Sequence, residues 1–321
     1  MLNQIVMVSL EDLVPQEHIY RKFSNIWKFD GVKTQLKEVE KENNYKGYGI
    51  FRLFKCLLLQ FMEDLSDREL ERYLNENTAA KWFCNFGLTE PTPDYSLFGK
   101  TRNRIGTELL SRLFNNLRDQ LRQKGYMNEV FSFIDASQLI AKANLWEDRD
   151  KAIKEKYEKL NNETLPKVAF DKEARIGCKG KDKYWYGYKK HISVDMQSGL
   201  INKVAITQAN ITDAKGLKHV CPKQGACYTD KGYCTKNAKS VAARRGCYLR
   251  AIKKNNMKDK NRDLDRWISS IRVPYESVFS KQRKRTRYCG IAKNQFSAFM
   301  EAICFNLRRL TVIEPHKVVL I

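Results

Sequence analysis

Residues 225–233 read Gly-Ala-Cys-Tyr-Thr-Asp-Lys-Gly-Tyr, and this stretch decides the fold. A short apolar run, Ala226 to Tyr228, leads into an acid, a base and a glycine. This pattern is typical of a buried strand whose last residue emerges at the edge of a sheet. In α/β sheets, ligands bind at the carboxyl ends of the strands. Asp230 is therefore the first candidate for a functional carboxylate.

Two further acids stand in comparable settings far away in the chain. Asp135 ends the apolar run 130–134, and Glu276 lies in the segment 272–279, Arg-Val-Pro-Tyr-Glu-Ser-Val-Phe. Taken singly, an Asp after a strand is more often a turn residue, and a Glu among arginines is more often part of an exposed salt-bridged face. Taken together in a basic chain, the three acids indicate a site for Mg²⁺, or Mn²⁺, that acts on a polyanion, because two-metal phosphodiester chemistry needs converging carboxylates.

The charge of the chain indicates the kind of partner. Its 321 residues include 59 Lys and Arg against 37 Asp and Glu, a formal charge of +22. This excess favours nucleic acid, with an anionic membrane surface as the second possibility. The most apolar run, 50–62, carries Arg52 and Lys55 and is too short to span a bilayer, and no signal peptide is visible. We therefore expect a cytoplasmic protein without a membrane partner.

The cysteines favour a reducing compartment. There are nine, an odd number, and they are spread through apparent helices and strands. Cys221, Cys227, Cys234 and Cys247 cluster in the sequence near His219. No CxxC pair is present, which favours buried core thiols over a zinc site.

The pattern of elements changes near residue 125. Residues 1–125 read as helices, with a capping box at 66–69, a breaker at 91–94 and the basic side chains Lys100, Arg102 and Arg104 on the helix that follows. Strands are expected at 130–139, 186–194 and 200–207, then a helix at 213–220, a strand at 226–229, a helix at 236–245 and a strand at 248–252. This order resembles the ribonuclease H fold, an α/β mixed sheet flanked by helices.

We accordingly divide the chain into an all-α N-terminal domain (1–125), an α/β domain (126–311) and a tail (312–321). A polar, basic insertion (143–184) interrupts the α/β domain, and its segment 176–181, Ile-Gly-Cys-Lys-Gly-Lys, reads as a basic glycine loop. An amphipathic helix closes the domain between Phe296 and Leu310.

The surroundings of Glu276 are strongly basic. Arg272, Glu276 and Arg283 are spaced by four and seven, which predicts one shared helical face. Pro274 complicates this helix and is expected either inside it or as its first residue. The run 281–287, Lys-Gln-Arg-Lys-Arg-Thr-Arg, contains no acid and is the strongest charge signal in the chain.

Several segments, taken in order, resemble the bacterial DDE transposases of insertion sequence five and relatives with a catalytic domain of the insertion-sequence-four type. The resemblance covers most of the chain from about residue 45. The matching segments are 66–70 (Ser-Asp-Arg-Glu-Leu), 93–96 (Pro-Asp-Tyr-Ser), 133–136 (Phe-Ile-Asp-Ala), 187–195 (Gly-Tyr-Lys-Lys-His-Ile-Ser-Val-Asp), 209–213 (Ala-Asn-Ile-Thr-Asp), 228–233 (Tyr-Thr-Asp-Lys-Gly-Tyr), 291–294 (Ile-Ala-Lys-Asn) and 306–310 (Asn-Leu-Arg-Arg-Leu).

This resemblance implies a ribonuclease H-like catalytic domain behind a helical DNA-binding domain. The metal-binding acids carry over to Asp135, Asp230 and Glu276, and Arg272 and Arg283 match basic positions around the last acid. The expected DNA contacts come from Arg272, Arg283, Lys281, Lys284, Arg285, Lys231, Lys100, Arg102 and Arg104.

The expected function is that of a metal-dependent transposase in the bacterial nucleoid, working as a homo-oligomer on DNA. It would bind the terminal inverted repeats of its own element, cleave DNA and join the freed 3′-hydroxyl ends to target DNA. Two alternatives remain open: a catalytically silent DNA-binding protein of transposase origin, and a related nuclease without strand transfer.

Overall fold

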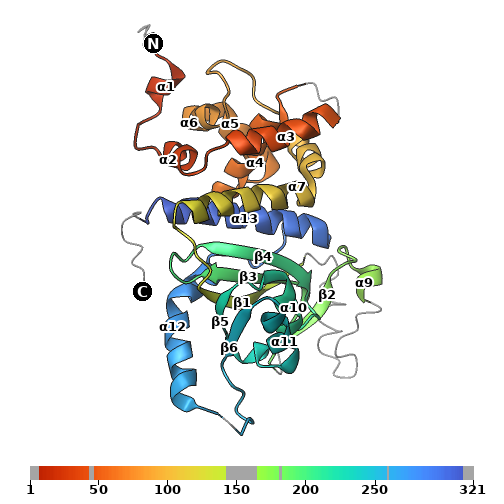
Figure 1. Ribbon diagram of the computed structural model, residues 1–321. Helices are drawn as coiled ribbons and strands as arrows, with labels where there is room; N and C mark the ends of the chain where they lie inside the picture. Colours follow the sequence, from red (N-terminus) through yellow and green to blue (C-terminus); the bar gives the residue numbers. More distant parts are fainter. Residues whose placement is uncertain (1–6, 43–46, 142–164, 181–182, 259, 314–321) are drawn as a thin grey trace. The chain divides into compact units, whose positions relative to one another are not determined.

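The computed structural model describes residues 7–42, 47–141, 165–180, 183–258 and 260–313. Seven helices come first (Figure 1): α1 (Leu10–Leu13), α2 (Ile19–Ile26), α3 (Asp30–Glu42), α4 (Ile50–Met62), α5 (Asp67–Glu76), α6 (Thr78–Phe83) and α7 (Tyr95–Gln123). The remaining elements are β1 (Phe131–Ile140), α9 (Leu165–Val168), β2 (Arg175–Lys179), β3 (Lys183–Asp195), β4 (Ile201–Gln208), α10 (Asp213–Val220), β5 (Gly225–Thr229), η2 (Lys231–Tyr233), α11 (Lys236–Arg244), β6 (Cys247–Ala251), α12 (Arg262–Ser280) and α13 (Ile291–Leu310). None of the helices within these ranges is long and apolar enough to cross a bilayer.

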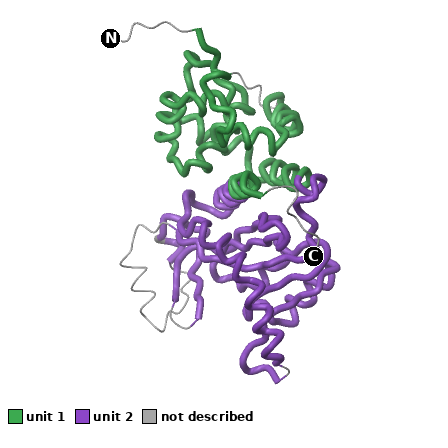
Figure 2. The backbone as a smooth tube through the Cα atoms, turned by 90° about the vertical axis from the view of Figure 1, so that its left-hand side faces the viewer, with its two compact units in different colours: residues 1–120, 303–317 green, residues 121–302, 318–321 purple. Residues whose placement is uncertain are grey.

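The chain divides into two compact units (Figure 2). One contains the described residues of 1–120 and 303–317, and the other those of 121–302. The first division lies close to the expected boundary at 125. At the other end, the last turns of α13 belong to the helical unit, because their buried side chains, Ile303 and Leu307, complete its core and the Cys304 thiol donates to the Leu58 carbonyl at 3.6 Å.

The helical unit is organised around α4, whose side chains are nearly all buried. The predicted capping box at the start of α5 is confirmed: the Ser66 hydroxyl accepts from the Glu69 backbone N–H, and the Glu69 carboxylate accepts from that of Ser66. Helix α7 is interrupted at Gly106, where φ is 62° and ψ is 174°, a conformation that glycine adopts readily.

The second unit is built on a mixed sheet. Strand β3 pairs antiparallel with β1, β2 and β4, whereas β1 pairs parallel with β5 and β5 parallel with β6. Along β4–β3–β1–β5–β6, three antiparallel strands are thus followed by two parallel ones with intervening helices. This is the ribonuclease H-like α/β core that the order of elements predicts.

One predicted loop is wrong. The segment 176–181 was expected to be a basic glycine loop, but Arg175–Lys179 form β2, paired with the first half of β3. A Cβ atom on Gly177 would lie 2.6 Å from the Ala209 carbonyl oxygen. The glycine therefore permits a close backbone approach within the sheet and does not mark a turn.

Successive residues of β5 face opposite sides of the sheet. Cys227 packs in a core with Leu217 of α10 and Ala238 of α11, whereas Tyr228 packs with Ile268 of α12. Helices α10 and α11 therefore cover one face, and α12 lies against the other.

Helix α12 settles one open alternative and corrects one expectation. It runs through Pro274, and it ends at Ser280, so Arg283 does not share a helical face with Arg272 and Glu276. The helix tolerates the proline because both sides of it are anchored. Ile268 is buried in the core before Pro274, and the Phe279 ring packs 5.3 Å from that of Phe133 after it.

Candidate active site

Asp230 directly follows β5 where that strand ends at one edge of the sheet, and Asp135 lies beside it in the middle of the longer strand β1. The parallel register of β1 and β5 pairs Phe133 with Tyr228 and Ile134 with Thr229, so each aspartate is the next residue on its strand. Equivalent positions on parallel strands point to the same face. The two carboxylates, 95 residues apart in the sequence, are therefore neighbours in the fold.

Asp135 lies in an environment that disfavours its charge. Burial raises its pKa to about 6, and repulsion from Asp230 adds to the effect. The Ala136 backbone N–H, which donates to Asp135 at 2.8 Å, acts in the opposite direction, as do the positive charges of Arg272 and Lys179. Lys179 comes from β2, so the strand that was expected to be a loop contributes to the electrostatics of this edge.

Arg272 connects α12 to this edge. Its guanidinium lies 3.9 Å from the Asp135 carboxylate and 4.9 Å above the centre of the Phe133 ring. The side chain is buried, and its Nε has no hydrogen-bond partner among the described residues. A buried guanidinium with an unused donor beside carboxylates is suited to bind a phosphate.

Asp230 caps the short η2 turn by accepting from the Gly232 backbone N–H at 2.7 Å. That turn brings a further acid close to it, Asp213 at the start of α10. A Cβ atom built on Gly232 would lie 3.0 Å from an Asp230 oxygen and 3.3 Å from an Asp213 oxygen. Lys189 of β3 binds Asp213 at 2.8 Å and partly neutralises the added negative charge.

The Tyr233 hydroxyl is buried beneath these acids. Burial raises its pKa, and Asp135, Asp213 and Asp230 raise it further, in that order. The hydroxyl has no hydrogen-bond partner in the described part of the chain. A buried polar atom of this kind is rare in proteins, and its position beneath the carboxylates fits a site that receives an ion or a water.

Glu276 occupies a different position from the two aspartates. It is exposed on α12, one turn after Arg272, and makes no ion pair or hydrogen bond with the described residues. Its helix packs on β1 through Tyr275 and Phe279, whose rings lie 6.4 and 5.3 Å from that of Phe133. The structure thus brings Asp135 and Asp230 together and leaves Glu276 on the adjoining helix.

The donor set of Asp135, Asp230 and Tyr233 fits a hard divalent cation, since two adjacent carboxylates and a hydroxyl offer only oxygen ligands. Among the residues that the structure describes, however, three such acids do not converge. Within the described ranges, the group of three possible ligand atoms lying within 4.8 Å of one another is Cys221, Cys227 and Cys247. These thiols sit in the core beneath α10 and α11, whereas Cys234 lies elsewhere, 3.5 Å from the Met257 sulfur.

The basic run after α12 is attached to the end of β1. The Lys284 carbonyl accepts from Ile140 N–H at 2.8 Å, and Thr286 N–H donates to the Ile140 carbonyl at 2.9 Å. Lys281, Lys284 and Arg285 are exposed, as is Lys231 beside Asp230, whereas Arg283 is half-buried and its pKa is lowered by that burial. Exposed cations therefore lie next to Ile140, the last residue of the strand that carries Asp135.

The basic residues of α7 differ among themselves. Lys100 and Arg104 are exposed. Arg102 binds the Asp67 carboxylate through two contacts of 2.8 and 2.6 Å and also donates to the Gln60 amide oxygen at 3.2 Å. Most of its donors are therefore used inside the helical unit.

The sequence interpretation assigned no role to Lys189, Asp213 or Tyr233. All three belong to segments that carry the resemblance to transposases, and this resemblance was the signal that could have identified them as functional residues. Nothing local indicated that Asp213 approaches Asp230, because this contact depends on the turn at Gly232.

The family models that match this chain both describe transposase domains. Residues 8–104 match a transposase domain of the DUF772 type, and residues 148–307 match a transposase DDE domain, a range that includes Asp230 and Glu276 but begins after Asp135. Among solved structures, the chain is similar to a piggyBac transposase in a synaptic complex with hairpin DNA, with 9% identity and a TM-score of 0.43 over 94% of this chain and 78% of that one. The two domain matches, in this order along the sequence, show that the chain belongs to the DDE transposases.

Proposed function

We propose that this protein is the transposase of an insertion sequence of the insertion-sequence-five type. It binds double-stranded DNA at the terminal inverted repeats of its element, hydrolyses a phosphodiester there and joins the 3′-hydroxyl ends to target DNA. The observation that carries this proposal is the adjacency of Asp135, in the middle of β1, and Asp230, directly after β5.

In this proposal Asp135 and Asp230 hold Mg²⁺, or Mn²⁺. Glu276 becomes a further ligand of these ions once DNA is bound. When bound, the ions would polarise the scissile phosphate and lower the pKa of an attacking water or hydroxyl. Arg272 positions a phosphate oxygen beside Asp135 with its guanidinium. The Tyr233 hydroxyl, which has no hydrogen-bond partner among the described residues, donates a hydrogen bond to a water or an ion-bound oxygen beneath the carboxylates.

The remaining basic residues position DNA in this proposal. Lys231, Lys281, Lys284 and Arg285 contact phosphates close to the catalytic edge, and Arg283 supports that segment from its half-buried place. In the helical unit, Lys100 and Arg104 contact the terminal repeats. We assign Arg102 to holding α7 against α5, because its guanidinium is bound to Asp67.

Cleavage of labelled terminal repeats tests the proposal. The Asp230→Asn variant should cut at about a thousandth of the native rate or less, because a Lewis acid contributes several kcal/mol and each 1.36 kcal/mol is tenfold in rate. Its affinity for the repeats should stay nearly unchanged. Asp263→Asn, at an exposed carboxylate on α12, is the matched control and should cut normally. Undiminished cutting by Asp230→Asn would refute the assignment.

The same assay separates the proposal from its two alternatives. A transposase gives both cleaved and joined products, whereas a related nuclease gives nicked DNA that is never joined. A silent DNA-binding protein binds the repeats and leaves them intact. Inverted repeats flanking the gene would supply the substrate, and the mass of the protein–DNA complex would show whether several subunits meet on paired ends.

A further inference from the structure

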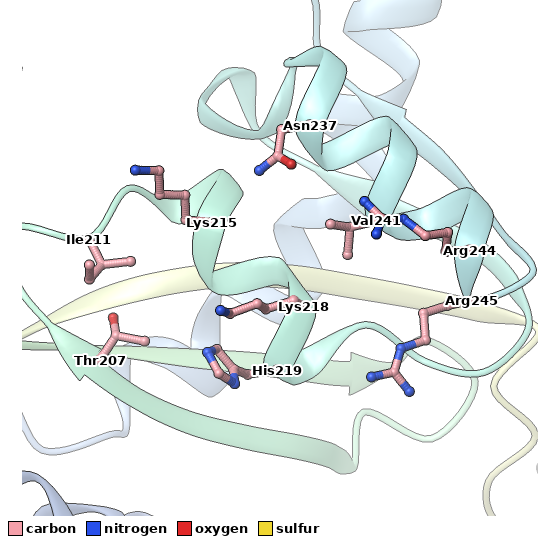
Figure 3. A pocket seen from close by; sticks show the side chains of 9 residues that line it. All are labelled: Thr207, Ile211, Lys215, Lys218, His219, Asn237, Val241, Arg244 and Arg245. Atoms are coloured by element: carbon pink, nitrogen blue, oxygen red, sulfur yellow. The ribbon is translucent and has the colours of Figure 1, made fainter.

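A pocket of about 520 Å³ lies between α10 and α11, on the face of the sheet opposite α12 (Figure 3). Its lining comes from the end of β4 and the turn after it, from α10 and from α11 and the residue that follows. The lining residues are Thr207, Ile211, Lys215, Lys218, His219, Asn237, Val241, Arg244 and Arg245. They include four permanent cations and no carboxylate.

No acid among the described residues neutralises these cations. In the described part of the chain, no acid pairs with Lys215, Lys218, Arg244 or Arg245, and Arg244 only contacts Ser240 of its own helix at 3.2 and 3.4 Å. Four like charges around one pocket repel one another. Such an arrangement is stabilised by an anion that enters it.

The position of Lys215 indicates that the pocket cations do more than stabilise the two helices. Lys218, Arg244 and Arg245 lie at the ends of α10 and α11, where positive charge is favourable because it offsets the helix dipole. Lys215 instead lies in the first turn of α10, where the dipole disfavours a cation. Its position therefore has no explanation in the stability of the helix.

The pocket begins at the catalytic edge of the sheet. Helix α10 starts at Asp213, which lies beside Asp230, and α11 follows η2, which Asp230 caps. Both helices run away from that edge, since each connects one strand end to the start of the next parallel strand. Lys215 and Asn237 therefore lie toward Asp230, and Arg244 and Arg245 lie toward the opposite edge.

The chemistry of the lining indicates the class of ligand. Sites for small organic molecules are mostly apolar, but the aliphatic lining here is limited to Ile211 and Val241. Sites for single strands stack bases on aromatic rings, and no Phe, Tyr or Trp lines this pocket. Lysines, arginines and an amide without a stacking platform match a duplex phosphate backbone.

We propose that the pocket between α10 and α11 binds successive phosphates of the DNA duplex on one side of the scissile bond. This inference rests on the proposed function, because it assumes that DNA reaches Asp230. It adds a contact on the α10–α11 face, separate from the basic run 281–287. The phosphates bound there continue the path of the DNA away from the carboxylates.

The test compares two double variants of equal charge. Lys215→Gln with Lys218→Gln removes two pocket cations, whereas Lys236→Gln with Lys239→Gln removes two exposed cations of α11 that do not line the pocket. Binding of a 30-base-pair duplex of random sequence is measured against salt concentration, without divalent metal so that no cleavage occurs. The pocket variant should bind on the order of tenfold more weakly at about 0.1 M salt. The slope of the logarithm of its affinity against the logarithm of the salt concentration should become shallower by about 2. The control variant should keep the native slope.

A footprint on the native protein makes the test independent of the variants' folding. Acetylation of lysines with and without the same duplex, read by mass spectrometry, should show protection of Lys215 and Lys218 but not of Lys236 and Lys239. Equal losses in the two double variants, or equal protection of the two lysine pairs, would overturn the pocket assignment alone. Failure of the native protein to bind the duplex at all would overturn the proposed function as well.

Discussion

Asp135 on β1 and Asp230 after β5 stand one residue beyond the last registered pair of these strands, Ile134 and Thr229. Their proximity is unfavourable in the protein by itself, because each carboxylate repels the other and burial raises the pKa of Asp135 to about 6. Functional sites often keep such unfavourable pairs, since a ligand of opposite charge relieves them.

Divalent metal should therefore stabilise the protein. Ions that bind only the folded state at a hundred times their dissociation constant add about 2.7 kcal/mol to the free energy of unfolding. The melting temperature should rise with Mg²⁺ or Mn²⁺ in the native chain and in Asp263→Asn, but hardly in Asp135→Asn or Asp230→Asn. An equal rise in all four proteins would show that the metal binds elsewhere.

Protonation of His191 should weaken the fold in acid. This side chain is buried on β3, its Nε2 lies 2.8 Å from the Thr207 hydroxyl, and burial lowers its pKa from 6.5 to about 4. Between these pH values the unfolded chain binds a proton that the folded chain does not, so stability falls as pH falls from 6.5 to 4. The loss should approach about 3 kcal/mol.

Urea unfolding at pH 7 and pH 4.5 checks this expectation. His191→Gln keeps a hydrogen-bonding group near Thr207 but cannot be protonated, so its stability should decrease less between the two pH values. If the native protein and His191→Gln lose the same stability between pH 7 and pH 4.5, titratable groups other than His191 cause the loss.

Much of the sheet could be predicted because its signals are local. The apolar run before Asp230 marks β5 and its end, and the run before Asp135 marks the first half of β1, which continues to Ile140. Once the order of elements indicates a ribonuclease H-like sheet, the two aspartates become neighbours. The helix 213–220 was predicted with the bounds that α10 has, since its apolar positions have helical spacing.

The remaining features depend on contacts that are distant in sequence. β2 escaped prediction because its glycine and lysines resemble a loop, and only its pairing with β3 makes it a strand. The end of α12 at Ser280 escaped because the basic run that follows contains no glycine or proline to mark it. The approach of Asp213 to Asp230 depends on one turn, which no periodicity reveals.

A methyl group on Gly216 should lift α10 from the sheet. Its Cβ would lie 2.1 Å from the His191 ring, which is itself fully buried and cannot move aside. Overpacking of this kind costs about 1–3 kcal/mol, so Gly216→Ala should lower the melting temperature. Gly99→Ala is the matched control within α7, because its new Cβ would meet only the end of the Arg102 side chain at 3.6 Å. That control should be neutral or gain up to about 1 kcal/mol from helix propensity.

Asp213 should support catalysis beside Asp230. Its carboxylate lies near the same Gly232 turn and is held by Lys189 at 2.8 Å, as a group that orients a metal ligand would be. Removing such a supporting group reduces activity or metal affinity by about 10- to 100-fold. Asp213→Asn should therefore slow cleavage by that factor, less than Asp230→Asn does, and weaken the stabilisation by Mg²⁺.

The double variant with Lys189→Met separates catalysis from stability. Lys189→Met alone leaves Asp213 without its partner and should lower the melting temperature, and adding Asp213→Asn should recover part of that loss because neither charge is then unpaired. Cleavage by the double variant should remain slow, since the carboxylate is still absent. Recovery of both stability and cleavage would mean that the pair only holds β3 and α10 together, and normal cleavage by Asp213→Asn alone would remove Asp213 from the active site.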